Sequence, residues 1–126
     1  MKFQITKLLH ASFLVEDTER ALRFYQGVLG LELDSSRPDL GFPGAWLSIG
    51  EQQIHLIQLP NPDSKERPAH GGHDRHIAMQ VEAIDVIKGR LEEASINFTV
   101  SKSRLDVIFI RDPDGNTLEL IGTHQN

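Results

Sequence analysis

One short pattern occurs twice in this chain. His10 begins the segment His-Ala-Ser-Phe-Leu-Val-Glu, and His76 begins the segment His-Ile-Ala-Met-Gln-Val-Glu. Each half also has a second ligand-type residue towards its end, which is His55 in the first half and Glu119 in the second. A chain built from two copies of one unit is expected to fold as two similar modules, with corresponding residues in corresponding places.

The first copy predicts the element order βαβββ. Alternating apolar residues predict a strand over 5–15, and Asp17 can cap a helix that ends at Gly30. A Pro- and Gly-rich segment and a Gly-Glu turn then separate the remaining elements. Three further strands are expected over 31–34, 45–49 and 53–59.

The second copy repeats this order after a polar loop over 60–74. It predicts a strand over 75–81 and a helix over about 85–94 that Asp85 caps. Strands are expected near 98–101, 107–111 and 117–122. The segment Asp-Pro-Asp-Gly-Asn at 112–116 is interpreted as a plain hairpin turn. The predicted class is a single α+β domain over 1–126, with one module at about 5–59 and the other at about 75–122.

Strand alternation separates the residues of these strands into two faces. The first is almost entirely apolar and is expected to pack under the helices: Ala11, Phe13, Val15, Ile54, Leu56, Ile77, Met79, Val81, Leu118 and Leu120. The second, named the polar face below, contains His10, Ser12, His55, Ile57, His76, Ala78, Gln80, Thr117, Glu119 and Ile121. Burying three imidazoles and a carboxylate on one face without a shared partner would be costly. The polar face therefore predicts a metal site made of His10, His55, His76 and Glu119.

Composition restricts the chemistry of such a site and the partners of the protein. The 126 residues include no cysteine, so a metal must be held by His, Asp or Glu. A formal net charge of -5 and a pI of about 5.6 argue against a nucleic-acid partner. The N-terminus lacks a signal-peptide pattern, and no apolar run reaches the roughly 18 residues that a membrane span needs. The expected location is cytoplasmic, with no membrane partner.

Several further residues are candidates for binding a substrate. Ser12 and Gln80 lie on the predicted polar face, while Phe42 and Trp46 could belong either to the pocket wall or to the core. Other polar side chains have a functional and a plain alternative. Lys102 and Arg104 could meet an anionic substrate or could be exposed hairpin charges. His70 and His73 have a metal-like spacing with His76, but the glycine pair between them favours a solvated loop.

Together, these motifs resemble the glyoxalase, bleomycin resistance and dioxygenase superfamily, also called the vicinal oxygen chelate superfamily, from about Lys7 to Ile121. The segments that carry the resemblance are Leu8-Leu9-His10, Val15-Glu16-Asp17, Phe24-Tyr25, Val28-Leu29-Gly30-Leu31, Gln53-Ile54-His55-Leu56, Arg75-His76-Ile77-Ala78, Asp112-Pro113-Asp114-Gly115-Asn116 and Leu118-Glu119-Leu120. The resemblance implies two βαβββ modules that form a cupped, mostly antiparallel mixed sheet with helices on the convex face. It also implies one divalent metal per site (Zn, Ni, Mn, Co or Fe), a small-molecule substrate and a homodimer.

The resemblance leaves three functions open. The chain is closest in pattern to glyoxalase I, which implies metal-dependent lyase or isomerase chemistry with Glu119 as a catalytic residue as well as a ligand. In that pattern the position of His55 is normally a glutamate, whereas extradiol dioxygenases and fosfomycin thiol transferases resemble His10, His76 and Glu119 alone. The alternatives are an extradiol-type dioxygenase or a non-enzymatic protein that binds a drug or metabolite. The antibiotic-binding members usually lack the ligand set, so its presence favours an enzyme.

Overall fold

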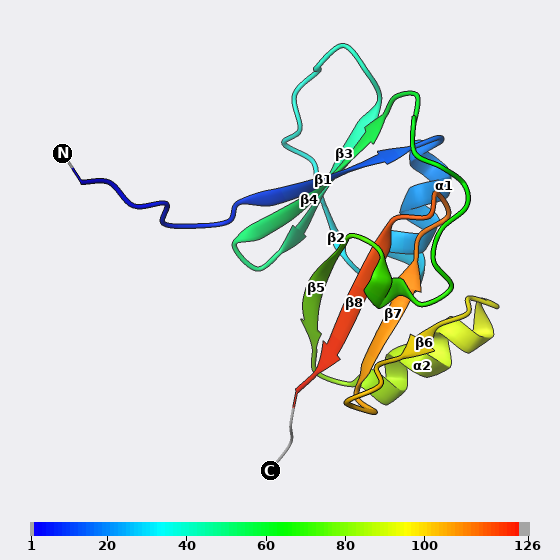
Figure 1. The fold of residues 1–126 in the computed structure, drawn as a ribbon. Helices are drawn as coiled ribbons and strands as arrows, with labels where there is room; N and C mark the ends of the chain where they lie inside the picture. The colour runs from blue at the N-terminus through cyan, green and yellow to red at the C-terminus, as the bar shows by residue number, and fades with distance from the viewer. Residues whose placement is uncertain (1, 124–126) are drawn as a thin grey trace.

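The computed structural model describes residues 2–123, and its two halves have the same order of elements (Figure 1). The first half contains β1 (His10–Val15), α1 (Thr18–Leu22), a π-helical segment (Arg23–Val28), β2 (Glu32–Asp34), β3 (Gly44–Ile49) and β4 (Gln52–Gln58). The second half contains a 3₁₀ turn (Gly71–His73), β5 (His76–Val81), α2 (Ile84–Glu93), β6 (Thr99–Val100), β7 (Val107–Arg111) and β8 (Thr117–Gly122). The predicted repeat of βαβββ modules is confirmed.

Each module forms its own four-stranded mixed sheet. The strand orders are β1-β4-β3-β2 and β5-β8-β7-β6, with the first pairing parallel and the other two antiparallel in each sheet. The α+β class and the mostly antiparallel pairing are therefore confirmed. Within one chain the modules form two sheets rather than one continuous sheet, and β1 and β5 each lie at an end of their sheet's strand order.

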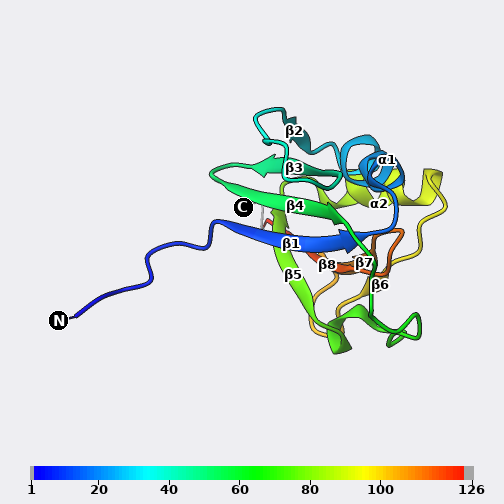
Figure 2. The same cartoon turned by 90° about the horizontal axis from the view of Figure 1, so that it is seen from above.

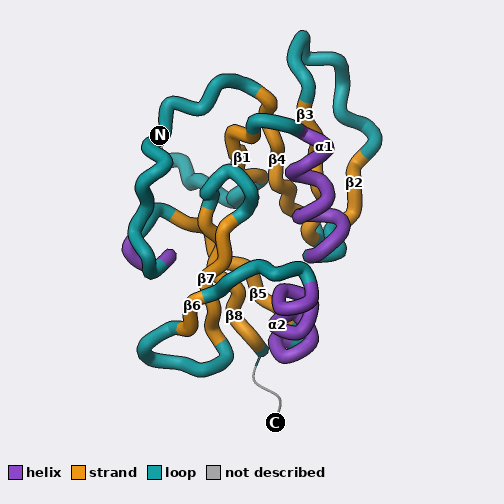
Figure 3. Tube along the Cα trace, turned by 90° about the vertical axis from the view of Figure 1, so that its right-hand side faces the viewer, coloured by secondary structure: helices purple, strands orange, loops and turns teal. Residues whose placement is uncertain are grey.

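The helices and the apolar sheet faces together form one core. α1 and α2 lie on the same side of the molecule, one beside each module (Figure 3). The buried core cluster contains residues of both modules, and it includes Val15, Ala21, Phe24, Tyr25, Ile54, Leu56, Leu91, Ile108, Ile110, Leu118 and Leu120. Phe13, Ile77, Met79 and Val81 pack against it. The apolar face predicted from strand alternation is thus the core face.

The helix boundaries follow the local sequence only in part. Asp17 caps α1 as predicted, because its Oδ1 accepts a hydrogen bond from Arg20 N at 3.2 Å. The chain then leaves the helical region at Gly30, whose φ is 73°. The prediction for Asp85 is wrong: α2 begins one residue earlier, after Ala83, and no side chain of the described residues caps it. Asp85 lies in the first turn, where its negative charge interacts favourably with the positive end of the helix dipole.

The first strand is shorter than predicted. β1 begins at His10 and not at Ile5, and residues 2–9 extend away from the body of the molecule (Figures 1 and 2). Within residues 2–123 the only strand beside β1 is β4, which begins at Gln52, so residues 5–8 find no strand to pair with. The extended segment exposes several large apolar side chains, namely Phe3, Ile5, Leu8 and Leu9.

The turn over 112–116 does more than close a hairpin, so its interpretation as a plain turn is wrong. Asp112 is only 4% exposed and accepts the phenolic hydrogen of Tyr25 in module one at 2.7 Å. Asn116 Nδ2 donates to the carbonyl of Leu14 at 3.1 Å, and Asp114 Oδ1 accepts from Glu16 N at 2.9 Å. The turn therefore connects the two modules through three polar contacts, of which the one between Tyr25 and Asp112 is buried.

The linker over 60–74 is more ordered than a solvated loop at its C-terminal end. His70 is partly buried, accepts a hydrogen bond from Gly72 N at 3.0 Å, and lies 5.1 Å from the ring of Phe109. His73 stacks on His70 and remains exposed. The expectation of a solvated loop is thus wrong for His70. Among the described residues, no helix is long and apolar enough to cross a bilayer.

Candidate metal centre

The module-one pair, His10 and His55, comes from the adjacent strands β1 and β4. Their rings stack with centroids 3.8 Å apart and an interplanar angle of 14°. On β3, Trp46 lies opposite His55 in the sheet and stacks on it at 4.5 Å and 10°. His55 therefore contacts two flat rings, which hold its imidazole in one plane on the polar face.

Its surroundings favour the neutral form of His55. Burial lowers the pKa of its imidazole, and the nearby His10 and Arg37 lower it further. A neutral imidazole keeps a lone pair on one ring nitrogen, which is the form that binds a metal. The ring also has a fixed polar neighbour, since its Nε2 lies 2.8 Å from Gln53 Oε1.

The module-two pair, His76 and Glu119, lies on β5 and β8. His76 Nε2 is 3.9 Å from Glu119 Oε2, and the two side chains are 27% and 21% exposed. The other ring nitrogen of His76, Nδ1, lies 2.8 Å from the carbonyl oxygen of Asp74. Because a carbonyl only accepts, Nδ1 carries a hydrogen, and in the neutral ring the lone pair is on Nε2, which lies beside the carboxylate.

The side chain of Asp74 is held by two arginines, and these contacts keep its backbone carbonyl in place beside His76. Its Oδ2 accepts from Arg67 Nε at 2.8 Å and from Arg111 Nη1 at 2.7 Å. The hydrogen bonds from Arg111 and then Arg67 hold the pKa of Asp74 well below its usual range. Arg111 also donates to Pro68 O at 2.6 Å, which ties the end of the linker to β7.

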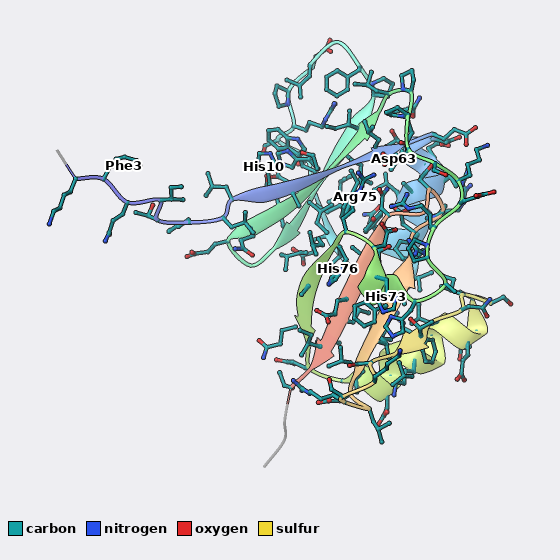
Figure 4. All side chains as sticks on the ribbon, in the orientation of Figure 1. Phe3, His10, Asp63, His73, Arg75 and His76 are labelled. Atoms are coloured by element: carbon teal, nitrogen blue, oxygen red, sulfur yellow. The ribbon has the colours of Figure 1, made fainter. Side chains whose placement is uncertain are left out.

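The two pairs do not meet within one chain. Over residues 2–123 no three His, Asp or Glu side chains come together as a metal-holding group. Figure 4 shows His10 and His76 at the starts of strands in different modules. Both β1 and β5 are end strands of their sheets, so each pair lies beside an edge that is unpaired in the described chain.

The donor chemistry of the four residues fits a divalent cation. Neutral imidazole nitrogens and a carboxylate suit zinc and the neighbouring transition metals. In module two, Nε2 of His76 lies 3.9 Å from the carboxylate, and Nδ1 contacts a backbone carbonyl, as is usual for a metal-binding histidine. The donor atoms of both pairs therefore suit a divalent cation, and their union in one site stays a prediction.

The predicted substrate-binding residues differ in how they are placed relative to the two pairs. Ser12 is in register with His55 and Trp46 is stacked on it, while Gln80 is on the polar face of β5. Phe42 is in the loop before β3, with the guanidinium of Arg37 5.3 Å from its ring centroid.

Lys102 and Arg104 follow β6, and Arg104 Nη2 donates to the carbonyl of Gly122 at the end of β8 at 3.3 Å. Arg104 makes a two-pronged contact with Asp106 at 2.9 and 2.7 Å. The roles of Lys102 and Arg104 in binding a substrate remain predictions.

Sequence reasoning missed three residues that surround the ligand candidates. Gln53 and Asp34 form a hydrogen-bonded chain to His55, and Asp74 orients His76. Alternation offered a signal for the first, since Gln53 lies two residues before His55 and therefore shares its face. Asp74 acts through its backbone carbonyl, for which no side-chain pattern gives a signal.

Two βαβββ modules with ligand-type residues on their polar faces define a protein of the vicinal oxygen chelate class. Residues 7–120 match the sequence model of the Glyoxalase/Bleomycin resistance protein/Dioxygenase superfamily, and the chain belongs to that family.

Its relatives and structural neighbours agree with this assignment. It is 35% identical over 123 residues to "Glyoxylase I 4" of Arabidopsis thaliana, covering 92% of this chain and 70% of that protein. It is 30% identical to the lactoylglutathione lyase of Salmonella typhimurium, covering 91% of each chain. A glyoxalase family protein from Bacillus anthracis has a TM-score of 0.80 at 26% identity, with 98% of this chain and 100% of that chain covered.

Proposed function

We propose that this protein is a divalent-metal-dependent enzyme of the glyoxalase kind, a lyase or isomerase whose small substrate presents two neighbouring oxygens. The observation that carries the proposal is the His76–Glu119 pair on the polar face, in which His76 Nε2 lies 3.9 Å from Glu119 Oε2 while Asp74 O occupies Nδ1. The relatives named lactoylglutathione lyase support the reaction class, since one of them is 30% identical over 91% of this chain.

His10, His55, His76 and Glu119 would hold the cation. A bound divalent cation supplies Lewis-acid stabilisation of negative charge on the substrate's two oxygens. Glu119 is the one carboxylate among these four residues. A proton that the substrate gives to a ligand carboxylate would therefore be accepted by an oxygen of Glu119. Trp46 and His10 cover both faces of the His55 ring and limit the access of water to it.

We infer that one site combines the module-one pair of one chain with the module-two pair of a second chain. The two pairs are separate within the described part of one chain, and each lies beside an unpaired sheet edge. Pairing these edges in a homodimer would satisfy their backbone groups and bring the pairs together. The apolar side chains exposed before β1, such as Leu8 and Leu9, would also gain cover.

Mixing two defective variants tests the shared site. One variant carries His10→Ala and His55→Ala, and the other carries His76→Ala and Glu119→Ala. Neither variant alone should bind zinc tightly, because each keeps only two ligands. After the subunits are mixed and exchanged at random, half of the dimers combine both variants, and each of these has one complete site of two. Zinc binding should therefore return to about a quarter of the native level.

The outcome separates the possible arrangements. No recovery, with heterodimers verified by mass spectrometry, would mean that each site is built within one chain. Full native binding by either variant alone would overturn the assignment of the ligands.

Activity is then measured with zinc, nickel, cobalt, manganese and iron(II) on glutathione hemithioacetals, catechols and acyl thioesters. Turnover of catechols with iron(II) and none of the hemithioacetals would replace the lyase by a dioxygenase.

A further inference from the structure

A chain of hydrogen bonds leads from β2 to the ring of His55. Gln53 Nε2 donates to Asp34 Oδ2 at 2.6 Å, and Gln53 Oε1 lies 2.8 Å from His55 Nε2. The three residues come from β2 and β4, and β3 lies between these strands. Gln53 thus connects a carboxylate two strands away to a predicted metal ligand.

Asp34, at the end of these hydrogen bonds that is farthest from His55, determines which groups donate and which accept. Asp34 Oδ1 accepts from Ser36 N at 2.9 Å and from Ser36 Oγ at 2.6 Å. These hydrogen bonds from Ser36 keep the pKa of Asp34 below its ordinary value, so the side chain is an ionised carboxylate at neutral pH. An ionised carboxylate can only accept hydrogen bonds.

The direction of every following bond is then determined. Gln53 must turn its NH₂ group towards Asp34, because a carbonyl facing the carboxylate would have no hydrogen to share. Its carbonyl oxygen therefore faces His55. A carbonyl accepts only, so His55 Nε2 must carry the hydrogen and Nδ1 must hold the lone pair.

The stacking around His55 keeps the ring in this orientation. Exchanging the positions of Nδ1 and Nε2 requires the imidazole to turn through a perpendicular arrangement. Parallel rings at 3.8 Å on the His10 side and 4.5 Å on the Trp46 side leave little room for that turn.

We propose that Gln53, oriented by Asp34, is a positioning residue that holds His55 as the Nε2–H tautomer, so that His55 presents Nδ1 to the cation. His76 does the opposite, since its Nδ1 is occupied by Asp74 O and its Nε2 keeps the lone pair. The half-sites of the two modules thus offer different ring nitrogens. The part of this inference that concerns the cation rests on the proposed function.

The tautomer is measured directly on the metal-free protein. Long-range ¹H–¹⁵N spectra of the imidazoles at about pH 8, above the ordinary pKa of a free histidine, distinguish a nitrogen that carries hydrogen from one that does not. A His55→Gln variant assigns the signals. In the native protein, His55 Nε2 should carry the hydrogen. The opposite tautomer, or an equal mixture of both, would overturn the inference whether or not the protein binds metal.

Three variants then ask whether Gln53 and Asp34 set that state. Gln53→Leu removes the acceptor, and Asp34→Ala frees the amide to turn, so both should give a mixture of His55 tautomers. Gln52→Leu is the matched control, because the neighbouring Gln52 is exposed and donates to Leu8 O instead. An unchanged Nε2–H tautomer in both Gln53→Leu and Asp34→Ala would refute the positioning role.

Zinc titration of the same samples completes the test. Binding should shift Nδ1 of His55 and Nε2 of His76, and Gln53→Leu should weaken zinc affinity about 10- to 100-fold, as loss of an outer-shell partner usually does. Coordination through His55 Nε2 would overturn the inference. If no zinc binds while the native tautomer is found, the proposed metal-dependent function fails and the tautomer control by Gln53 stands.

Discussion

Tyr25 donates its phenolic hydrogen to Asp112 at 2.7 Å and so joins the helical segment of module one to the last hairpin of module two. Both residues are buried, with Tyr25 at 0% and Asp112 at 4% exposed. The same carboxylate accepts from the backbone of Asp114 and from both the backbone and the side chain of Asn116. Burial raises the pKa of Asp112, and these four donors offset only part of the cost of burying its charge.

Replacing Tyr25 by Phe should destabilise the protein by about 2 kcal/mol, the usual scale of a hydrogen bond to a buried charge. The ring would still fill the core, so the loss reports the hydroxyl group. Urea unfolding at neutral pH measures the change. An unfolding free energy equal to that of the native protein would show that the hydroxyl contributes no net stability.

Alkaline pH should act on the same contact. Burial, and then the charge of Asp112, raises the pKa of Tyr25 well above its ordinary value of 10.0. The unfolded chain then loses the phenolic proton at a lower pH than the native one, so stability from this group is complete below the ordinary pKa and is lost as the pH rises towards the folded pKa.

The chain has one tyrosine, so tyrosinate absorbance reports this residue alone. Native protein should show no tyrosinate transition near pH 10. Its unfolding free energy should fall from about pH 9 to about pH 11 more steeply than that of Tyr25→Phe. A free, reversible tyrosine titration near pH 10 in the folded protein would contradict this account.

The sequence predicted the modules well because each rests on local patterns. Strand alternation identified both the core face and the polar face, since burial of one sheet face imposes a period of two. The pattern failed at Ile5, where alternation continues but no neighbouring strand is available within the described chain. The start of β1 depends on which strand lies beside it in the fold, and alternation within one segment gives no information about that neighbour.

The sheet faces of the candidate ligands could be predicted from the sequence, whereas the separation of the two pairs could not. Alternation predicted that His10 shares a face with His55 and that His76 shares a face with Glu119, and the strand register of each sheet agrees. It could not indicate that the pairs lie apart within one chain. Local turn chemistry likewise predicted only a plain hairpin for 112–116, because the contact between Tyr25 and Asp112 joins residues far apart in the chain.

Two glycines should respond to alanine in opposite ways. A Cβ at Gly71 would lie 2.8 Å from both Phe109 Cβ and Thr117 Cγ2, so the 3₁₀ turn would have to move. Gly71→Ala should therefore destabilise the fold by about 1–3 kcal/mol. Gly89 lies within α2, where an added methyl group would meet no described atom within 4 Å, and Gly89→Ala should stabilise by about 0.5–1 kcal/mol.

Thermal and urea unfolding of both variants give the comparison. Because the 3₁₀ turn immediately precedes Asp74, whose carbonyl orients His76, Gly71→Ala should also weaken zinc binding. Gly89→Ala should leave zinc affinity unchanged. Equal stabilities for the two variants would mean that the linker adjusts without cost.

The last prediction concerns His55, the position at which this chain departs from the glyoxalase I pattern. An imidazole there carries no charge and leaves Glu119 as the one carboxylate among the four predicted ligands. A general base must reach the proton that it removes, and a neutral imidazole held by Gln53 and bound to a cation is poorly suited to that task. Native turnover of glutathione hemithioacetal should therefore be slow. His55→Glu should raise it by on the order of 10-fold or more, since a positioned base commonly contributes at least that much. His55→Gln is the control, because it places an uncharged side chain of similar length at the same position and should not raise turnover. Fast native turnover that survives His55→Ala would refute this account, because proton transfer would then depend on another residue.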